Sequence, residues 1–329
     1  MSRWRSRKHA RPDADTTEPI LDTKPSVPFA KPDSSSWRPR LLSFHQLPAW
    51  MRDNEFILHH YRPPTFSYPE CFRSLAYLHN ETGNVYSHLL GAALFVILAI
   101  SFAIWSVSHE PDYVTWGWID LGVVFTFCAG AIGCMGCSAL FHLVSCHSEP
   151  VASLWNKCDY LGIVFLIVGS FYPAVYFAFY CFPMWQISYL ASLTILGLLT
   201  SWMSVSDHFQ SKEYRVHRAI IFSLLGCSGV IPLVHTMVNH GLDHAVEALG
   251  LWYFVAMGVL YLTGAFLYGA RIPERFYPGK FDLFFHSHQL FHVFVVIAAW
   301  LHYVGIMEAF EWVHGRDSRG DPWCKRVTM

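Results

Sequence analysis

The sequence His286-Ser-His-Gln-Leu-Phe-His292 opens a long apolar run, Val293-Phe-Val-Val-Ile-Ala-Ala-Trp-Leu-His-Tyr303. His288 and His292 are four residues apart, so on a helix they share one face with their Cβ atoms about 6 Å apart. Two neutral imidazoles at this spacing can bind one Zn²⁺, which needs a third protein ligand from elsewhere in the chain. His286 points off that face, and we expect it at the membrane interface.

The composition places most of the chain in a membrane. Apolar residues make up 53% of the 329 residues and charged residues only 14%, whereas soluble proteins carry about 25% charge. Seven apolar runs follow a polar start, and each is long enough to cross a hydrocarbon core of about 30 Å. We place the spans at residues 84–106, 118–144, 155–180, 184–206, 217–239, 250–270 and 286–306. The sequence therefore predicts an all-α, seven-transmembrane helical bundle in one compact domain.

The flanking segments differ from the spans in composition. Residues 1–44 are rich in Pro, Ser and charged residues, and we predict a disordered tail. Residues 45–83 form a juxtamembrane segment, with a short amphipathic helix expected near 45–52 and residues 307–329 as a C-terminal tail. The nine cysteines show no paired Cys-x-x-Cys motifs, so we expect no thiolate metal site and no disulfide framework.

The positions of lysine and arginine predict the orientation. Twelve of the 23 precede residue 81, seven lie in the second, fourth and sixth linkers, and none lies in the first, third or fifth. Positive residues favour the cytosolic side. We therefore expect a cytosolic N-terminus, an extracytosolic C-terminal tail, and a multi-pass protein of the plasma membrane or endoplasmic reticulum.

This orientation brings polar residues of three spans to one depth near the cytosolic face. They are Ser138, His142, Asp159, His288 and His292. Ionisable groups inside spans are costly and usually face the bundle interior. Three imidazoles and one open position are typical of a hydrolytic zinc, so we predict His142, His288 and His292 as its ligands. Ser138 could reach the zinc-bound water, and Asp159 could orient it or accept its proton. Two alternatives for Asp159 stay open: it pairs with Lys157, or it is an interfacial cap.

A second polar group opens the first span. Glu81, Asn84 and His88 recur at spacings of three and four residues, so they line one helix face. Two interpretations remain open: a polar buttress between helix ends, or a direct role in handling the substrate.

Several motifs resemble the progestin and adipoQ receptor family, which includes adiponectin receptors, haemolysin III proteins and fungal zinc-homeostasis membrane proteins. The motifs are Glu81-x-x-Asn84-x-x-x-His88, Ser138-x-x-x-His142, Asp159-Tyr-x-Gly162, Pro273-Glu-Arg-x-x-Pro-Gly-Lys-Phe-Asp282 and Ser287-His288-Gln-x-Phe-His292. The resemblance covers roughly residues 45–306. It implies zinc on the three histidines, a cavity open to the inner leaflet and cytosol, and hydrolysis of ceramide to a sphingoid base and a fatty acid.

Three functions follow from these observations. The leading hypothesis is a zinc-dependent, ceramidase-like amide hydrolase linked to lipid and zinc homeostasis, with ceramide or a fatty acid as its lipid partner and control by an extracellular protein ligand left open. The alternative is a receptor or sensor whose zinc is structural. Zinc transport is weaker, because we see no second ionisable set toward the outer face of the second or third span. Nucleic acid is not an expected partner.

Overall fold

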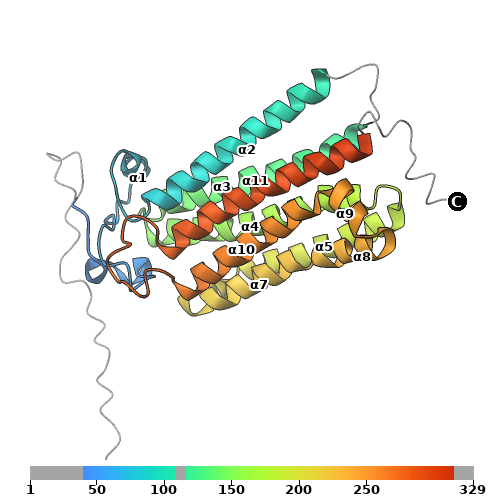
Figure 1. Cartoon of the computed structure of the whole chain (residues 1–329). Coiled ribbons are helices and arrows are strands. Elements are labelled where there is room, and N and C mark those ends of the chain that lie inside the picture. The colour runs from blue at the N-terminus through green and yellow to red at the C-terminus, as the bar shows by residue number, and fades with distance from the viewer. Residues whose placement is uncertain (1–39, 109–115, 315–329) are drawn as a thin grey trace, which may run out of the picture.

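Seven long helices form the bundle in the computed structural model, which describes residues 40–108 and 116–314 (Figure 1). Their bounds are α2 Thr82–Ser108, α3 Trp118–Val144, α4 Glu149–Ala178, α5 Pro183–Ser204, the pair α7 Arg215–Cys227 and α8 Val230–His240, α10 Leu251–Ala270 and α11 Ser287–His314. Each is long and apolar enough to cross a membrane, with α7 and α8 together making one crossing. The described residues form no β-sheet, only one isolated bridge between Leu42 and Tyr61. The predicted all-α fold with seven spans is confirmed.

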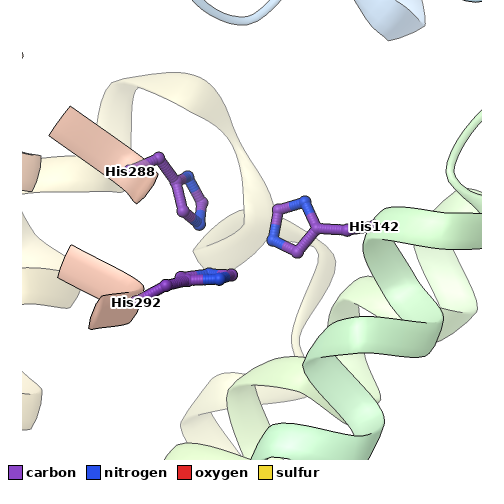
Figure 2. A group of neighbouring side chains, drawn as sticks. All are labelled: His142, His288 and His292. Carbon is purple, nitrogen blue, oxygen red and sulfur yellow. The ribbon is translucent and has the colours of Figure 1, made fainter. Parts of the chain in front are cut away.

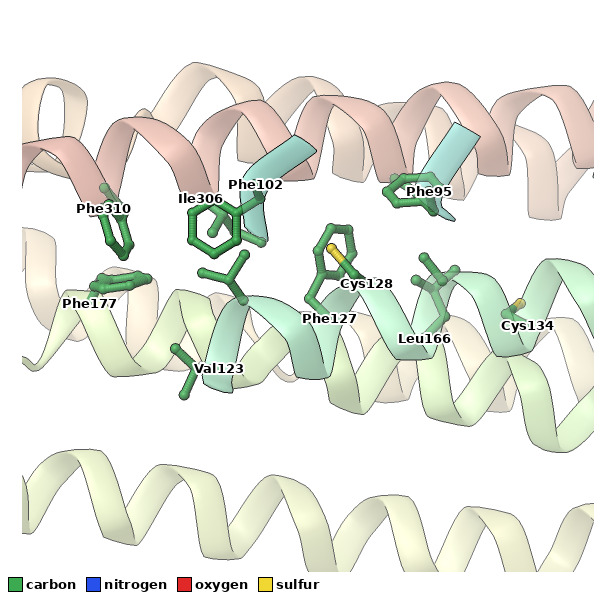
Figure 3. Packing of buried hydrophobic residues seen from close by; sticks show 14 of the residues in the cluster. Phe95, Phe102, Val123, Phe127, Cys128, Cys134, Leu166, Phe177, Ile306 and Phe310 are labelled. Carbon is green, nitrogen blue, oxygen red and sulfur yellow. The ribbon is translucent and has the colours of Figure 1, made fainter. Parts of the chain in front are cut away.

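The helix α3 is the centre of the bundle. In its most apolar stretch 56% of the residues are buried, against 11% in α10, most of whose residues are half-buried. The main core lies between α3, α2, α4 and α11, where Phe95, Phe127, Leu166 and Phe310 are buried (Figure 3).

Glycines allow α3 and α4 to approach closely. A Cβ atom on Gly130 would lie 2.7 Å from the backbone oxygen of Phe165, and one on Gly162 would lie 2.9 Å from Cα of Cys134. Small residues at helix contacts are how membrane helices gain van der Waals packing without a hydrophobic driving force. This packing fixes the relative depth of the residues that α3 and α4 carry.

Three spans differ clearly from the prediction. The third begins at Glu149, six residues before its predicted start. The seventh continues to His314, eight residues beyond its predicted end, because Ile306 and Phe310 pack into the core and hold the helix past the charged Glu308. The fifth is broken at Ser228 and Gly229 into α7 and α8. Pro232 explains the break, since its ring crowds the carbonyl four residues earlier, at Ser228.

The juxtamembrane segment also departs from the prediction. The prediction of an amphipathic helix near 45–52 is wrong. Two short 3₁₀ turns, Phe44–Gln46 and Ala49–Met51, lie there instead. Pro48 separates them, because proline disfavours helical backbone in the residue before it. Residues 1–39 of the predicted disordered tail lie outside the described residues. Within its last residues, 40–44, Leu42 is ordered and forms a β-bridge with Tyr61. Three short α-helices and two further 3₁₀ turns complete the order: α1 Tyr68–Arg73, α6 Asp207–Gln210 and α9 Leu242–Leu249, with the turns Ser74–Ala76 and Lys212–Tyr214.

Candidate metal centre

Three histidines from α3 and α11 converge at the end of the bundle nearest the juxtamembrane segment. Their candidate ligand atoms all lie within 4.8 Å of one another. The ring centroid of His142 lies 4.9 Å from that of His288 and 4.9 Å from that of His292. Figure 2 shows His142 pointing from α3 toward the pair on α11. The structure thus brings together the three ligands predicted from the sequence.

The geometry and the donor atoms fit a divalent metal. Nitrogens bound tetrahedrally to one zinc at about 2.1 Å lie about 3.4 Å apart, so the rings need to close by only about 1 Å. His142 Nε2 is buried and has no hydrogen-bond partner in the described part of the chain, which leaves its lone pair for such an ion. Among residues 40–108 and 116–314, this is the one group of three or more His, Cys, Asp or Glu that could hold a metal.

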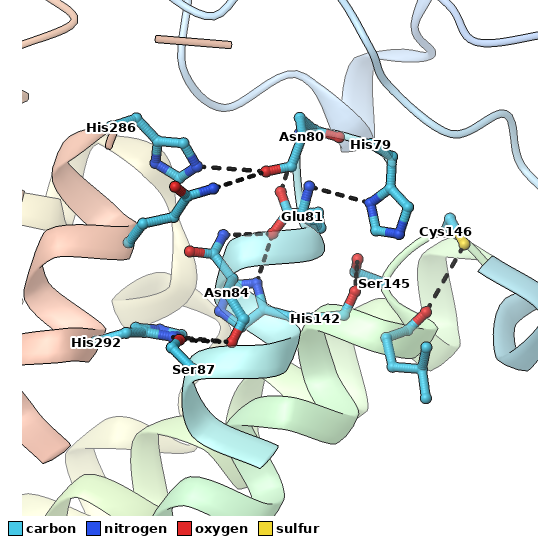
Figure 4. A network of polar contacts seen from close by, with 12 residues as sticks. His79, Asn80, Glu81, Asn84, Ser87, His142, Ser145, Cys146, His286 and His292 are labelled. Carbon is cyan, nitrogen blue, oxygen red and sulfur yellow. Dashed lines mark hydrogen bonds and ion pairs between the residues drawn. The ribbon is translucent and has the colours of Figure 1, made fainter. Parts of the chain in front are cut away.

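The Nδ1 atoms of two of these histidines form hydrogen bonds with α2 and with the residue that precedes it (Figure 4). His142 Nδ1 donates to Glu81 Oε2 at 2.7 Å, and Asn84 Nδ2 donates to the same oxygen at 2.6 Å. His292 Nδ1 donates to the backbone oxygen of Asn84 at 3.2 Å. Such contacts fix the tautomer and orientation of a ligating imidazole. They place Glu81 and Asn84 as the polar buttress, one of the two roles the sequence left open.

The centre opens onto a cavity of about 310 Å³ that Ser138 and Asp159 also line. Asp159 is 7% exposed, and the Ser138 hydroxyl is buried without a partner among the described residues. Lys157 does not neutralise Asp159, because its ammonium lies 2.8 Å from Asp207. The alternative in which Lys157 pairs with Asp159 is therefore wrong, and the carboxyl borders the cavity.

His88 lies directly against a predicted ligand. Its ring stacks on that of His292, with centroids 3.6 Å apart and planes 1° apart. Both of its nitrogens are buried and lack partners in the described part of the chain, and the side chain lines the cavity. His286, by contrast, is not the interfacial residue we expected: it is 2% exposed and its Nε2 lies 3.4 Å from the backbone oxygen of Asn80.

Comparison with known proteins places this centre in a family. The family model described as "Haemolysin-III related" matches residues 76–303, which include all of the residues above. The chain belongs to the haemolysin-III-related family.

Individual relatives of this haemolysin-III-related chain carry receptor names. It is 43% identical over 270 residues to "Progestin and adipoQ receptor-like protein 1" of Caenorhabditis elegans, covering 82% of this chain and 61% of that protein. It is 41% identical over 275 residues to "Adiponectin receptor protein" of Drosophila melanogaster, covering 83% and 60%. It is 40% identical over 283 residues to "ADIPOR-like receptor IZH2" of Saccharomyces cerevisiae, covering 85% and 87%. The chain thus spans about three fifths of the first two relatives. Together with its seven spans, these matches identify an adiponectin-receptor-like, multi-pass integral membrane protein.

Sequence reasoning missed several buried charged residues in this haemolysin-III-related chain. Arg62 and Glu274 are 2% and 0% exposed. At the far end of the bundle, Asp120 Oδ1 lies 3.1 Å from His314 Nε2, and both side chains are buried. The second span therefore does carry an ionisable group toward its other end, and our stated ground against transport was wrong. Hydropathy could not reveal the Asp120–His314 pair, because His314 lay beyond the predicted end of the seventh span.

A disulfide was also missed. Cys181 is disulfide-bonded and lies between α4 and α5, at the end of the bundle opposite the three histidines. Cys71 and Cys146 remain free, with their sulfurs 3.6 Å apart in a buried contact. The spacing of cysteines in the sequence cannot by itself show which of them form disulfides.

Proposed function

We propose that this protein is a zinc-dependent amide hydrolase that acts on ceramide-like lipids. The observation that carries the proposal is that His288 and His292, two of the three convergent imidazoles, border one largely apolar cavity together with a buried carboxyl and a buried hydroxyl. A cavity of about 310 Å³ lies at the lower end of the size of known small-ligand sites. The resemblance to the progestin and adipoQ receptor family supplies the expected substrate class.

Each predicted residue has a chemical task in this proposal. His142, His288 and His292 would hold the zinc. Bound zinc supplies Lewis-acid chemistry, namely a nucleophilic water near neutral pH and a polarised amide carbonyl. Asp159 accepts the proton that the attacking water gives up and returns it to the leaving amine. The C–N bond breaks, and a fatty acid and an amine are released.

The remaining polar residues position these groups. The Ser138 hydroxyl, without a protein partner among the described residues, donates a hydrogen bond toward the reacting oxygen. Glu81 and Asn84 hold the rings of His142 and His292. His88 has free nitrogens at the cavity wall and contacts polar groups of the lipid.

We also propose the orientation with the histidine end at the cytosol. The distribution of lysine and arginine supports it, and the disulfide at Cys181 on the opposite end supports it independently, because disulfides persist in oxidising compartments. The substrate amide would then be cleaved near the inner leaflet.

A second function is favoured by one observation, the receptor names of the relatives. In that case the zinc is structural: it ties α3 to α11, and an extracellular protein ligand acts through the bundle without turnover. The two functions make opposite predictions for Asp159, which is not one of the three proposed ligands.

The test uses the purified full chain in lipid nanodiscs. His288→Ala should remove bound zinc, measured by elemental analysis, and abolish ceramide hydrolysis, measured by release of fatty acid. Asp159→Asn should retain zinc and lose turnover by about 100-fold or more. The exposed His45 provides the control, and His45→Ala should match the wild type in both measurements. Loss of zinc with persistent turnover in His288→Ala would refute the mechanism, and full activity in Asp159→Asn would favour the receptor.

A further inference from the structure

The segment Asp53–Arg62, which we call the juxtamembrane strap, crosses the end of the bundle between the two parts of the chain that carry the histidines. Figure 1 shows this part of the chain beside the loop that joins α10 to α11. The helix α3 packs mainly on α4 and α2, whereas α11 packs mainly on α10 and α2. The backbones of α3 and α11 approach each other closely at few positions, so contacts made through other segments also set the distance between His142 and the pair on α11.

At one end of the strap, Arg62 holds the last turn of α3. Its guanidinium donates to the backbone oxygen of His142 at 2.5 Å and to that of Leu143 at 2.7 Å, and also to Ser74 Oγ at 2.8 Å. The last carbonyls of a helix lack partners within the helix and favour a positive charge. Arg62 supplies both the donors and the charge, and it binds the ligand residue His142 itself.

At the other end of the strap, Glu274 holds the first turn of α11. Its Oε2 accepts from the backbone N–H of Ser287 at 2.7 Å, and its Oε1 accepts from the Ser287 hydroxyl at 2.5 Å. The same Oε1 accepts from Asn54 Nδ2, in the strap, at 3.1 Å. A carboxylate is favoured where helix N–H groups are unpaired. The residue after Ser287 is the ligand residue His288.

Between these two ends the strap is bound along its length. Asp282 accepts from the backbone N–H groups of Leu58 and His59, each at 2.9 Å. Gly279 N–H donates to the backbone oxygen of Phe56 at 3.0 Å. The strap and the loop between α10 and α11 therefore form one hydrogen-bonded unit, and this unit contacts both ligand-bearing helices.

We propose that the juxtamembrane strap sets the metal affinity of the centre, with Arg62 and Glu274 as positioning residues. Metal binding requires each ligand within about 0.2 Å of its bonding distance, while the ligands come from residues far apart in the chain. Arg62 fixes the end of α3 at His142, Glu274 fixes the start of α11 at His288, and the strap fixes these two ends relative to each other. The inference rests on the proposed metal site but not on the proposed reaction.

Two conservative substitutions test the strap in the full chain in nanodiscs. Arg62→Lys keeps the charge but loses the fork that reaches several acceptors. Glu274→Gln keeps one acceptor for α11 but loses the charge. Zinc affinity is measured by competition with a chelator, and visible absorption of bound Co²⁺ reports the ligand geometry. Each variant should bind zinc roughly 10-fold or more weakly and shift the Co²⁺ absorption, with the thermal stability of the metal-free protein also recorded.

Matched controls come from an exposed pair in the same part of the chain. Arg73 and Glu70 form an ion pair at 2.7 Å with the arginine side chain about half exposed, so Arg73→Lys and Glu70→Gln should bind zinc as the wild type does. Wild-type zinc affinity in both strap variants would overturn the inference, even if they melt at a lower temperature, because that is the result of a purely structural contact.

A further variant covers the case in which a buried substitution prevents folding. Asn54→Ala removes the strap's side-chain contact with Glu274 and leaves the contacts of Glu274 with Ser287 in place. This variant should also bind zinc more weakly, by about threefold, a smaller loss than in the Arg62 and Glu274 variants. Unchanged zinc affinity would overturn the inference. A wild-type protein that binds no zinc would instead refute the proposed metal site itself, and the strap with it.

Discussion

Replacing Glu81 by glutamine tests the metal centre without removing a ligand. Glu81 Oε2 accepts from His142 Nδ1 at 2.7 Å and from Asn84 Nδ2 at 2.6 Å, while Oε1 accepts from Asn80 Nδ2 at 3.1 Å. Glutamine has the same shape but carries an amide in place of one oxygen. All three neighbours are donors, so the new NH₂ group must face a donor whichever way it turns.

The expected loss follows from these contacts. Removing the partner of a ligating histidine typically weakens metal binding 10-fold to 100-fold, which corresponds to about 1.4 to 2.7 kcal/mol. We expect the upper half of this range. The substitution removes a charge-assisted hydrogen bond, which is about twice as strong as a neutral one, and also creates a donor–donor contact.

The measurement is zinc affinity of the purified full chain by chelator competition, with Glu70→Gln as the control for loss of one exposed carboxylate. Zinc affinity equal to that of the wild type would refute the reasoning, since it would mean that Glu81 does not act on a bound metal through His142.

Two further predictions concern stability. Gly130→Ala should destabilise the bundle by about 1–3 kcal/mol through overpacking, because its Cβ would meet the Phe165 carbonyl at 2.7 Å; Gly133→Ala, with open space around its Cβ, should melt like the wild type. Burial lowers the pKa of His79 to about 3, against about 6.5 in the unfolded chain. The unfolded state therefore binds more protons between these values, and the stability of the metal-free protein should fall as pH drops below about 6.5. His79→Gln should reduce that fall by about 2 kcal/mol between pH 7 and pH 5, measured from thermal unfolding at the two pH values with a chelator present.

The sequence was sufficient for the spans because hydropathy and length are properties of the chain itself. The predicted second span, 118–144, coincides with α3. The seventh was predicted too short because Glu308 and Glu311 lower the local hydropathy, although Phe310 is 1% exposed in the core. Hydropathy averages over a helix, whereas packing depends on which face each residue occupies.

The convergence of the three histidines was predictable for a related reason. The four-residue spacing of His288 and His292 places both on one helix face, and depth in the membrane brought His142 to the same level. The same spacing argument placed Glu81, Asn84 and His88 on one face but could not say what they touch. The structure shows what two of them touch: Glu81 contacts His142, and His88 stacks on His292.

The contacts of the strap were beyond the sequence because they join residues far apart in the chain: Arg62 and Leu143 are 81 positions apart, and Asn54 and Glu274 are 220 positions apart. No periodicity within one helix encodes such a pair. The sequence predicts that this segment lies at the membrane surface, and its one arginine, Arg62, was counted only as evidence of orientation.

The count of lysines and arginines used to predict the orientation included both buried and exposed arginines. Arg62, Arg218 and Arg271 are 2%, 5% and 8% exposed, and each donates to backbone oxygens, so buried contacts account for their positions without any role in orientation. The orientation argument survives their removal, because the polar start of the chain and the even-numbered linkers still hold most of the remaining lysines and arginines. Charges that hold helix ends and charges on which the proposed orientation rests therefore gather at the same end of the bundle as the three histidines. A substitution that tests orientation should accordingly use exposed residues such as Arg73, where no buried contact is lost.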